Sequence, residues 1–166
     1  DKTYDTKAVA VSVDNLEITG SKGKISFTYE KKVDNTWEAM QEAPTGAGTY
    51  RVTASLAGDN NYKSAVSQPL EFTIDKADTV LEFTVNDLDK VYDGKTMVAP
   101  TNQVGNSHAR VLSWYQLSED GQWAKLEKAP VDAGSYKVVA SVEADDNYNG
   151  AEIEMEFEIT KAQPSY

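Results

Sequence analysis

The sequence has no cysteine, a single histidine and few basic residues. Its 166 residues include 16 lysines and arginines against 27 aspartates and glutamates, which gives a formal net charge of −11. The absence of cysteine excludes disulfides, thiolate nucleophiles, cysteine-ligated zinc and iron–sulfur clusters, and one imidazole leaves little for a histidine-based site. The acidic balance argues against nucleic acid and anionic membrane surfaces as partners, because such a chain repels phosphate groups.

Long hydrophobic runs are also missing. No stretch approaches the roughly 20 apolar residues that a transmembrane helix needs, so we expect no membrane insertion. The apolar fraction of 40%, with three tryptophans and nine tyrosines, is nevertheless enough to build packed cores. The chain should therefore fold despite its charge.

The most informative feature that is present is an internal repeat. The segment DKTYDTK at residues 1–7 returns as DKVYDGK at residues 89–95. A second block, APTGAGTYRVTAS from Ala43, returns as APVDAGSYKVVAS from Ala129, and LEFTIDKA later returns as MEFEITKA. The matches keep the same order, so we predict two copies of one module, at residues 1–77 and 78–166.

The two copies do not begin at equivalent points. TVLEFTV at residues 79–85 precedes the second copy and has the alternating, β-branched pattern of a strand. The first copy has no counterpart, so we expect its module to lack the opening strand and the chain to be an excised segment of a longer array. The closing strand of the first module continues through Lys76 and Ala77 into the next opening strand. Because so short a junction limits bending, we expect an elongated pair.

Apolar and polar residues alternate along most of each module. Tyr50 and Val52 begin one such run, and Tyr136 and Val138 begin the matching run in the second copy. A period of two indicates strands with one buried face, and clusters of Gly, Asn and Asp separate the runs as turns. No apolar residues recur at helical spacing over three turns. We therefore predict an all-β protein of two tandem sandwich modules, each of about 80 residues.

A tyrosine corner indicates an immunoglobulin-like topology for these sandwiches. In DAGSYKV, at residues 132–138, a tight turn precedes Tyr136, whose hydroxyl can bond the upstream backbone. Val138 stands where disulfide-bonded domains of this topology carry their second cysteine, and Val52 does so in the first copy. The two sheets of each module must then be held together by packing alone.

A core tryptophan is a further mark of the same topology. Trp114, in the segment WYQ, resembles the tryptophan that such domains place against the core. In the first copy, Thr28 aligns with it. We therefore expect the two cores to differ at this position.

Several motifs together resemble a known group of repeats. They are KVYDGK at residues 90–95, the Gly-x-Tyr-x-Val strand, the GDNNY loop at residues 58–62 and the closing Phe-x-Ile-x-Lys-Ala. These motifs are similar to the bacterial immunoglobulin-like and MBG-type repeats of large surface proteins, although the first copy has Thr6 where the second has Gly94. The resemblance covers nearly the whole chain. It implies an extracellular, wall-associated or secreted protein whose modules serve as stalks or adhesive units, and it brings no catalytic residues.

Clustered acidic residues in two loops suggest calcium as the one candidate cofactor. The oxygen ligands that this hard cation prefers are offered by Asp87, Asp89 and Asp93, and separately by Asp145 and Asp146. Neither group matches a calcium-loop consensus. The alternative is that these side chains build turns and stay hydrated, as Asp side chains commonly do.

Loop aromatics are the candidate ligand contacts. Trp37 and Trp123 follow hairpin turns, and Tyr62 and Tyr148 lie in the acidic loops of the two copies. Such aromatics could stack on sugar rings, but their recurrence in both copies favours a shared packing role that caps the ends of the sandwich. An isopeptide or ester cross-link is a further option, for which residue spacing nominates no pair.

These observations together favour a protein that is not an enzyme. No nucleophile elbow, phosphate-binding loop, dinucleotide fingerprint or zinc-protease motif occurs, and His108 lies in a polar loop with no paired nucleophile in sequence. We predict a monomeric, extracellular repeat segment of a bacterial surface protein that acts as a stalk, spacer or adhesion module, with neighbouring modules as its partners. The alternative is a module that binds a host glycan, mucin or protein ligand.

Overall fold

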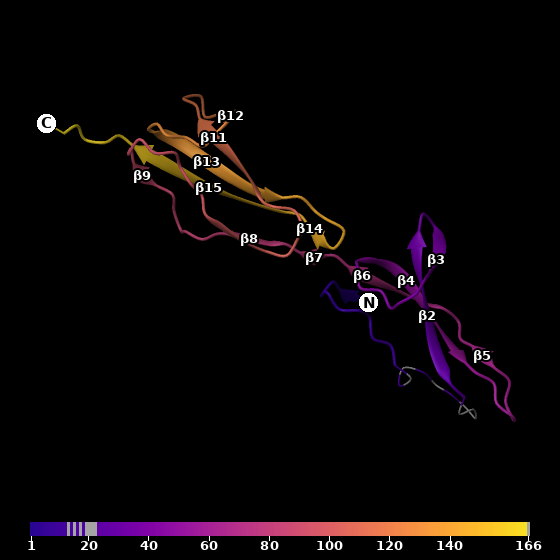
Figure 1. The fold of residues 1–166 in the computed structure, drawn as a ribbon. Coiled ribbons are helices and arrows are strands. Elements are labelled where there is room, and N and C mark those ends of the chain that lie inside the picture. The colour runs from indigo at the N-terminus through magenta and orange to yellow at the C-terminus, as the bar shows by residue number, and fades with distance from the viewer. Residues whose placement is uncertain (13, 15, 17, 19–22, 166) are drawn as a thin grey trace. The chain divides into compact units, whose positions relative to one another are not determined.

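The computed structural model describes residues 1–165 except 13, 15, 17 and 19–22. The chain divides into two compact units, Asp1–Ala77 and Asp78–Tyr166. The described residues form strands and contain no α-helix. The protein is therefore all-β, and it consists of two tandem modules of the β-sandwich type, of which only the second has both layers among its described strands (Figure 1).

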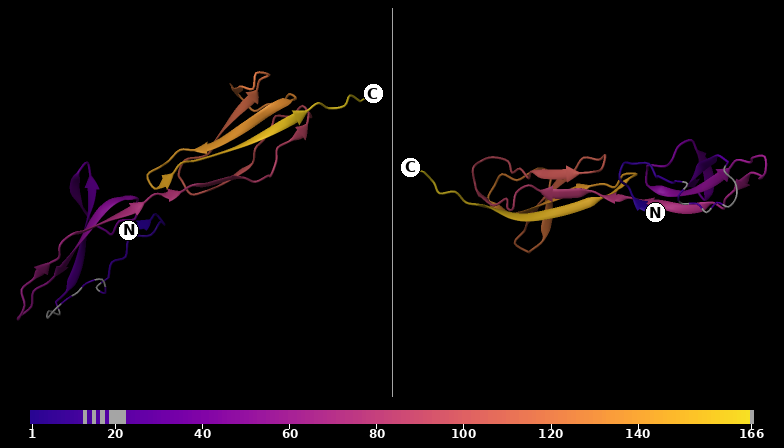
Figure 2. Two further views of the ribbon diagram at one scale, coloured as in Figure 1. Left: turned by 180° about the vertical axis from the view of Figure 1, so that it is seen from behind. Right: turned by 90° about the horizontal axis from the view of Figure 1, so that it is seen from below.

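The second unit is a two-layered sandwich. One layer is a five-stranded sheet in the order β12-β11-β13-β15-β9, and the other is the antiparallel pair of β10 and β8. The strands are β8 (Val80–Phe83), β9 (Lys90–Val91), β10 (Thr101–Val104), β11 (Val111–Leu117), β12 (Trp123–Leu126), β13 (Gly134–Val142), β14 (Tyr148–Asn149) and β15 (Ala151–Thr160). The further views show β8 and β10 on one face of the larger sheet (Figure 2).

The core of the second unit lies between these layers. Along β13 every second side chain from Tyr136 to Val142 is buried, with Val138 and Ala140 at 0% exposure, which is the pattern that the alternating sequence predicts. Trp114 packs edge-on against Phe157, with ring centroids 5.9 Å apart. Leu81 of β8 packs with Ala140 and Val142 of β13 in a second cluster of buried residues.

The first unit consists of a single described sheet. Its order is β1-β6-β4-β2-β3, and β5 pairs with β4. The strands are β1 (Lys2–Thr3), β2 (Ile25–Val33), β3 (Thr36–Met40), β4 (Gly48–Leu56), β5 (Ala65–Val66) and β6 (Leu70–Asp75); β7 (Ala77–Asp78) lies at the boundary of the units. Tyr50, Val52 and Ile74 are its buried apolar core residues. Among the described residues of this unit, no strand takes the place of β8.

The register of the two sheets corrects the alignment of the core aromatics. Trp114 is opposite Val138, and the residue opposite the equivalent Val52 is Tyr29. Thr28, which the sequence aligns with Trp114, is opposite Thr53 and is exposed. The alignment was wrong by one residue because the copies differ in loop length, and a shift of one residue exchanges the two faces of a strand.

The turns show how sequence differences are accommodated. Thr6 has φ 70° and Gly94 has φ 75°, so both copies form the same left-handed turn although only one has glycine there. Asp34 and Asn35, at φ 49° and 66°, form the two-residue hairpin turn between β2 and β3. Residue types that tolerate positive φ therefore mark most of these turns, and Thr6 is the exception.

Candidate functional site

Asp145 organises the acidic loop of the second unit. One carboxylate oxygen accepts hydrogen bonds from the backbone N–H groups of Asn147 and Tyr148, at 2.9 and 2.7 Å. The other accepts bonds from the N–H and hydroxyl of Ser107, at 2.7 and 2.8 Å. These bonds, led by that of the Ser107 N–H, hold the pKa of Asp145 well below its usual range. Both oxygens are thus occupied by protein donors.

The same arrangement recurs in a simpler form in the first unit. Asp59 accepts hydrogen bonds from the N–H groups of Asn61 and Tyr62, both at 2.8 Å. An Asp side chain commonly stabilises a turn by accepting hydrogen bonds from the backbone N–H groups two and three residues later in the chain. The recurrence assigns a local structural role to both aspartates.

The second candidate acidic group lies around β9. Asp87 accepts the N–H of Asp89 at 2.6 Å, and Asp93 accepts the N–H of Lys95 at 2.9 Å and the ammonium of Lys90 at 3.0 Å. The hydrogen bond from the Lys95 N–H and that from the Lys90 ammonium lower the pKa of Asp93. Each carboxylate here has a backbone donor of its own.

The structure does not bring these acids together as one site. Asp87, Asp89 and Asp93 follow one another around β9, whereas Asp145 stands beside Ser107, and its exposed neighbour is Asp146. Across the described part of the chain, no three carboxylate or histidine side chains are grouped so that they could hold a metal ion.

Asp89 belongs to a feature that we call the terminal clamp: β9, the end of β15, and the hydrogen bonds between them. β9 pairs in parallel with the end of β15, with Lys90 opposite Ile159. Asp89 accepts the N–H of Glu158 at 2.7 Å, and the N–H of Tyr92 donates to the carbonyl of Thr160 at 2.8 Å. The segment that follows β8 and the last strand of the module are thereby joined.

The first unit has a terminal clamp of the same construction. β1 pairs in parallel with the end of β6, with Lys2 opposite Ile74. Asp1 accepts the N–H of Thr73 at 2.8 Å, and the N–H of Tyr4 donates to the carbonyl of Asp75 at 2.8 Å. The repeated Asp-Lys-x-Tyr segment is therefore the sequence that builds the clamp, a role that the repeat alone did not indicate.

Tyrosine corners lock the turn ahead of the central strand in both units. The Tyr136 hydroxyl donates to the carbonyl of Asp132 at 2.8 Å, and the Tyr50 hydroxyl donates to the carbonyl of Gly46 at 2.6 Å. Burial raises the pKa of both hydroxyls, and Asp132 adds to the effect on Tyr136, so both remain protonated donors at neutral pH. Val138 lies on the buried face of the same strand, at 0% exposure.

Trp37, on β3, lies on the outer face of the first unit against a cation of β4, with β2 between the two strands. The Arg51 guanidinium is 4.5 Å from the centre of the Trp37 ring and forms two hydrogen bonds with Glu30, at 2.8 and 3.0 Å. These bonds lower the pKa of Glu30 and raise that of Arg51. One face of the Trp37 ring is therefore covered by the guanidinium.

Trp123 has the equivalent position in the second unit. The Lys137 ammonium lies 4.8 Å from its ring centre and 5.3 Å from that of Tyr115. Both tryptophans are half-buried, so they pack across a strand of their own sheet. Arg51 and Lys137 were not identified from the sequence, although their shared place in the GTYRV and GSYKV segments is a signal that could have found them.

The two loop tyrosines differ in their surroundings. Tyr148 lies over Gly105, where a Cβ would come within 2.5 Å of its ring, and Gly105 has φ 83°. Tyr62 in the first unit is 50% exposed. Tyr148 therefore has a packing partner in the loop after β10, whereas half of Tyr62 is exposed to solvent.

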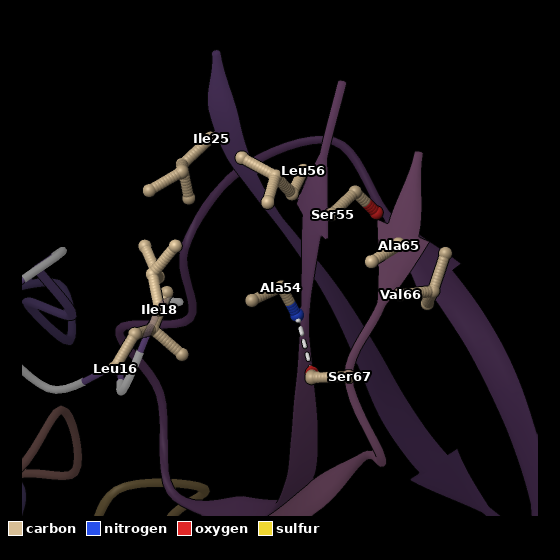
Figure 3. Close-up of a pocket in the computed structure, with 9 residues that line it drawn as sticks. All are labelled: Leu16, Ile18, Ile25, Ala54, Ser55, Leu56, Ala65, Val66 and Ser67. Carbon is tan, nitrogen blue, oxygen red and sulfur yellow. Dashed lines mark hydrogen bonds between the residues drawn. The ribbon is translucent and has the colours of Figure 1, made fainter. Parts of the chain in front are cut away.

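An apolar pocket opens on the inner face of the first unit. It has a volume of about 250 Å³ and is lined by residues of β2, β4, β5 and the chain before β2: Leu16, Ile18, Ile25, Ala54, Ser55, Leu56, Ala65, Val66 and Ser67. In Figure 3 the side chains of Ile25, Ala54 and Leu56 are directed toward Leu16 and Ile18 across this space. No titratable side chain lines it.

Comparison with known proteins gives one positive result. The family model described as the MBG domain matches the chain twice, at residues 1–78 and 82–163. No curated protein matches the chain. None of the described residues forms a helix with the length and apolar character of a membrane span.

Proposed function

Because the chain belongs to the MBG domain family and carries two copies of the domain, we propose that it is a non-catalytic spacer segment that resists tension in a bacterial surface protein. MBG repeat domains are typical of large surface proteins. An extracellular location and the absence of enzymatic activity are parts of the same proposal. The observation that carries it is the terminal clamp, present in both modules.

The clamp supports a tension-bearing role through its geometry. β9 and the end of β15 are parallel and adjacent, so a pull on the chain just before β9 and on the chain just after β15 draws the two strands in opposite directions along their common axis. The hydrogen bonds between parallel strands are evenly spaced, so the pull loads them together instead of one after another. Separation of the strands then requires several bonds to break at once.

The hydrogen-bonding groups at the clamp bond to other groups of the same module. Asp89 and the backbone of Tyr92 bond the closing strand, and Asp93 bonds Lys90 and Lys95. Because these groups are satisfied within the module, they stabilise the clamp and are not presented to a ligand. This supports a spacer over the alternative of glycan binding, for which Tyr62 is the most open of the four candidate aromatics.

The proposal is tested by stretching the full chain from its two ends in a single-molecule experiment. We expect two unfolding events, one for each module. Tyr92→Pro removes the N–H that donates to Thr160 and should lower the force of one event while leaving the other unchanged.

A matched control is Ala124→Pro, on the edge strand β12, which pairs only with β11. This change weakens the module outside the clamp, so it should lower thermal stability without a comparable loss of unfolding force. If Tyr92→Pro left both forces unchanged, or if the two proline variants lowered force equally, the clamp would not be the tension-bearing element.

A further inference from the structure

The acidic loop of the second unit holds the backbone nitrogen that follows each of two asparagines. The N–H of Ser107, directly after Asn106, donates to one oxygen of Asp145 at 2.7 Å. The N–H of Tyr148, directly after Asn147, donates to the other oxygen at 2.7 Å. Both nitrogens are therefore fixed on a carboxylate and directed away from the asparagine side chains that precede them.

A third asparagine of this loop, Asn149, is followed by Gly150, and the carboxylate bonds of the loop end before this pair. Asn149–Gly150 is the one Asn-Gly pair of the sequence. Both residues are exposed, and Gly150 lies between β14 and β15 as part of neither strand. The nitrogen of Gly150 thus lacks the support that Asp145 gives to the other two.

Glycine is required at this position by the close approach of the backbone. A Cβ on Gly150 would lie 2.8 Å from the carbonyl oxygen of Val142 and 3.2 Å from the nitrogen of Ala144. Because glycine has no side chain, nothing on the residue itself shields its nitrogen from the preceding side chain. The packing of the loop therefore fixes an Asn-Gly pair at an exposed place.

We propose that Asn149–Gly150 is a site of spontaneous deamidation, a covalent modification of the second unit. Asparagine is among the residues that limit the thermal lifetime of proteins. In the first step the nitrogen of Gly150 attacks Cγ of Asn149, the N–Cγ bond forms, and the Cγ–Nδ2 bond breaks. Nδ2 leaves as ammonia and takes the proton of the Gly150 N–H. Water then adds to one carbonyl of the cyclic imide and opens it to aspartate or isoaspartate, with nothing oxidised or reduced.

The modification would act on the residues that lead into β8. Asn149 Nδ2 donates to the carboxylate of Asp78 at 2.9 Å, and the backbone carbonyl of Asn149 accepts the Thr79 hydroxyl at 2.6 Å. Deamidation replaces the amide donor by a second carboxylate beside Asp78, so a hydrogen bond is lost and like charges repel. The isoaspartate product also lengthens the backbone and displaces the carbonyl that Thr79 bonds. Both products therefore loosen this attachment.

The first unit has a different pair at the equivalent position. Leu56 is opposite Ala65 there, as Val142 is opposite Ala151 in the second unit. The two residues before Ala65 are lysine and serine, at positions 63 and 64. The modification is accordingly specific to the second module.

The first arm of the test incubates the full chain at mildly alkaline pH and physiological temperature and maps its peptides by mass spectrometry. We expect Asn149 to convert to a mixture of aspartate and isoaspartate while Asn106 and Asn147 stay intact. Asn149→Gln is the matched control, because its longer side chain keeps the amide and disfavours ring closure, so it should stay unmodified. A peptide of residues 146–152 (DNYNGAE) gives the rate of the unfolded segment.

Ser107→Gly separates the effect of the fold from that of the sequence. This variant places a second Asn-Gly pair at Asn106 and keeps the N–H that donates to Asp145. In the folded chain Asn149 should convert well before Asn106, and in urea both should convert at similar rates. Equal rates at the two pairs in the folded variant would overturn the proposal. So would an intact Asn149 in the full chain under conditions that convert the peptide.

The second arm tests the consequence for the second unit. Asn149→Asp should lower its urea midpoint, followed through the indole signals of Trp114 and Trp123, and added salt should reduce the loss. Adding Asp78→Asn should restore the midpoint, because the amide and the carboxylate then exchange places. An unchanged midpoint in Asn149→Asp, or a loss that Asp78→Asn does not restore, would overturn the assigned effect on Asp78.

Discussion

The contrast between the two modules predicts that one substitution has opposite effects at equivalent positions. Ala54 lines the open pocket of the first unit, and Ala140 is fully buried in the second against Leu81 and Val142. We expect Ala54→Leu to stabilise the first unit and Ala140→Leu to destabilise the second. The difference arises from one strand, β8, which packs on Ala140 and has no counterpart among the described strands of the first unit.

The expected magnitudes follow from burial. Leucine adds three carbon atoms to alanine, and complete burial of each CH₂ contributes about 0.8 kcal/mol. Because the pocket is open to solvent on one side, we expect about 1 kcal/mol of stabilisation for Ala54→Leu, less than half of the full value. The fully packed site has no room, so Ala140→Leu should cost roughly 1–3 kcal/mol through displaced side chains.

The assay must report on each module within the full chain. Trp37 is the one tryptophan of the first unit, and Trp114 and Trp123 belong to the second. Their indole N–H signals, followed by nuclear magnetic resonance through a urea series, give a separate unfolding midpoint for each unit. A destabilising effect of Ala54→Leu as large as that of Ala140→Leu would refute the reasoning, because it would mean that the inner face of the first unit is already filled.

Four further predictions concern the turns, corners and loops. Tyr136→Phe should cost the second unit about 0.5–1.5 kcal/mol in a urea titration, since it removes the hydroxyl bond to Asp132. Thr6→Gly should stabilise the first unit by about 1 kcal/mol, because glycine adopts φ 70° without the steric cost borne by threonine; an unchanged midpoint would show that the turn is not strained. The pKa of Asp145 is lowered in the folded protein, so its contribution is present above the unfolded pKa of about 3.9 and is lost as the pH falls below it. The stability difference between the wild type and Asp145→Asn should accordingly shrink below about pH 4. Excess calcium or a chelator should leave the melting temperature unchanged, because Asp87, Asp93 and Asp145 already accept backbone hydrogen bonds; a clear rise with calcium would contradict this assignment.

The fold could be predicted well from the sequence because its signals are local or repeated. Alternation along residues 134–142 predicts a strand with one buried face, and the structure confirms the all-β prediction for two tandem modules. The MBG-type repeats that the motifs resemble are likewise confirmed by the family match. Agreement between two copies makes such patterns stronger than either copy alone.

The parts that could not be predicted depend on neighbours across strands. Trp37 and Trp123 were recognised as recurring aromatics, but periodicity does not show that Arg51 and Lys137 lie over their rings. The error at Thr28 has the same origin, because register is decided by pairing and not by counting from the nearest motif. Asp89 was likewise expected to be a loop ligand, and its bond to a strand 69 residues later is visible only in three dimensions.

The central claim, that the terminal clamp bears tension, is tested most directly by the direction of pull. Because the chain has no cysteine, pairs of introduced cysteines provide unique handles. Asn86→Cys with Gln163→Cys loads the parallel pair of β9 and β15 along its axis, and Ala109→Cys with Glu127→Cys opens the β11–β12 hairpin one bond at a time. We predict a clearly higher unfolding force for the first pair of handles. Equal forces in the two directions, or a lower force across the clamp, would contradict the account.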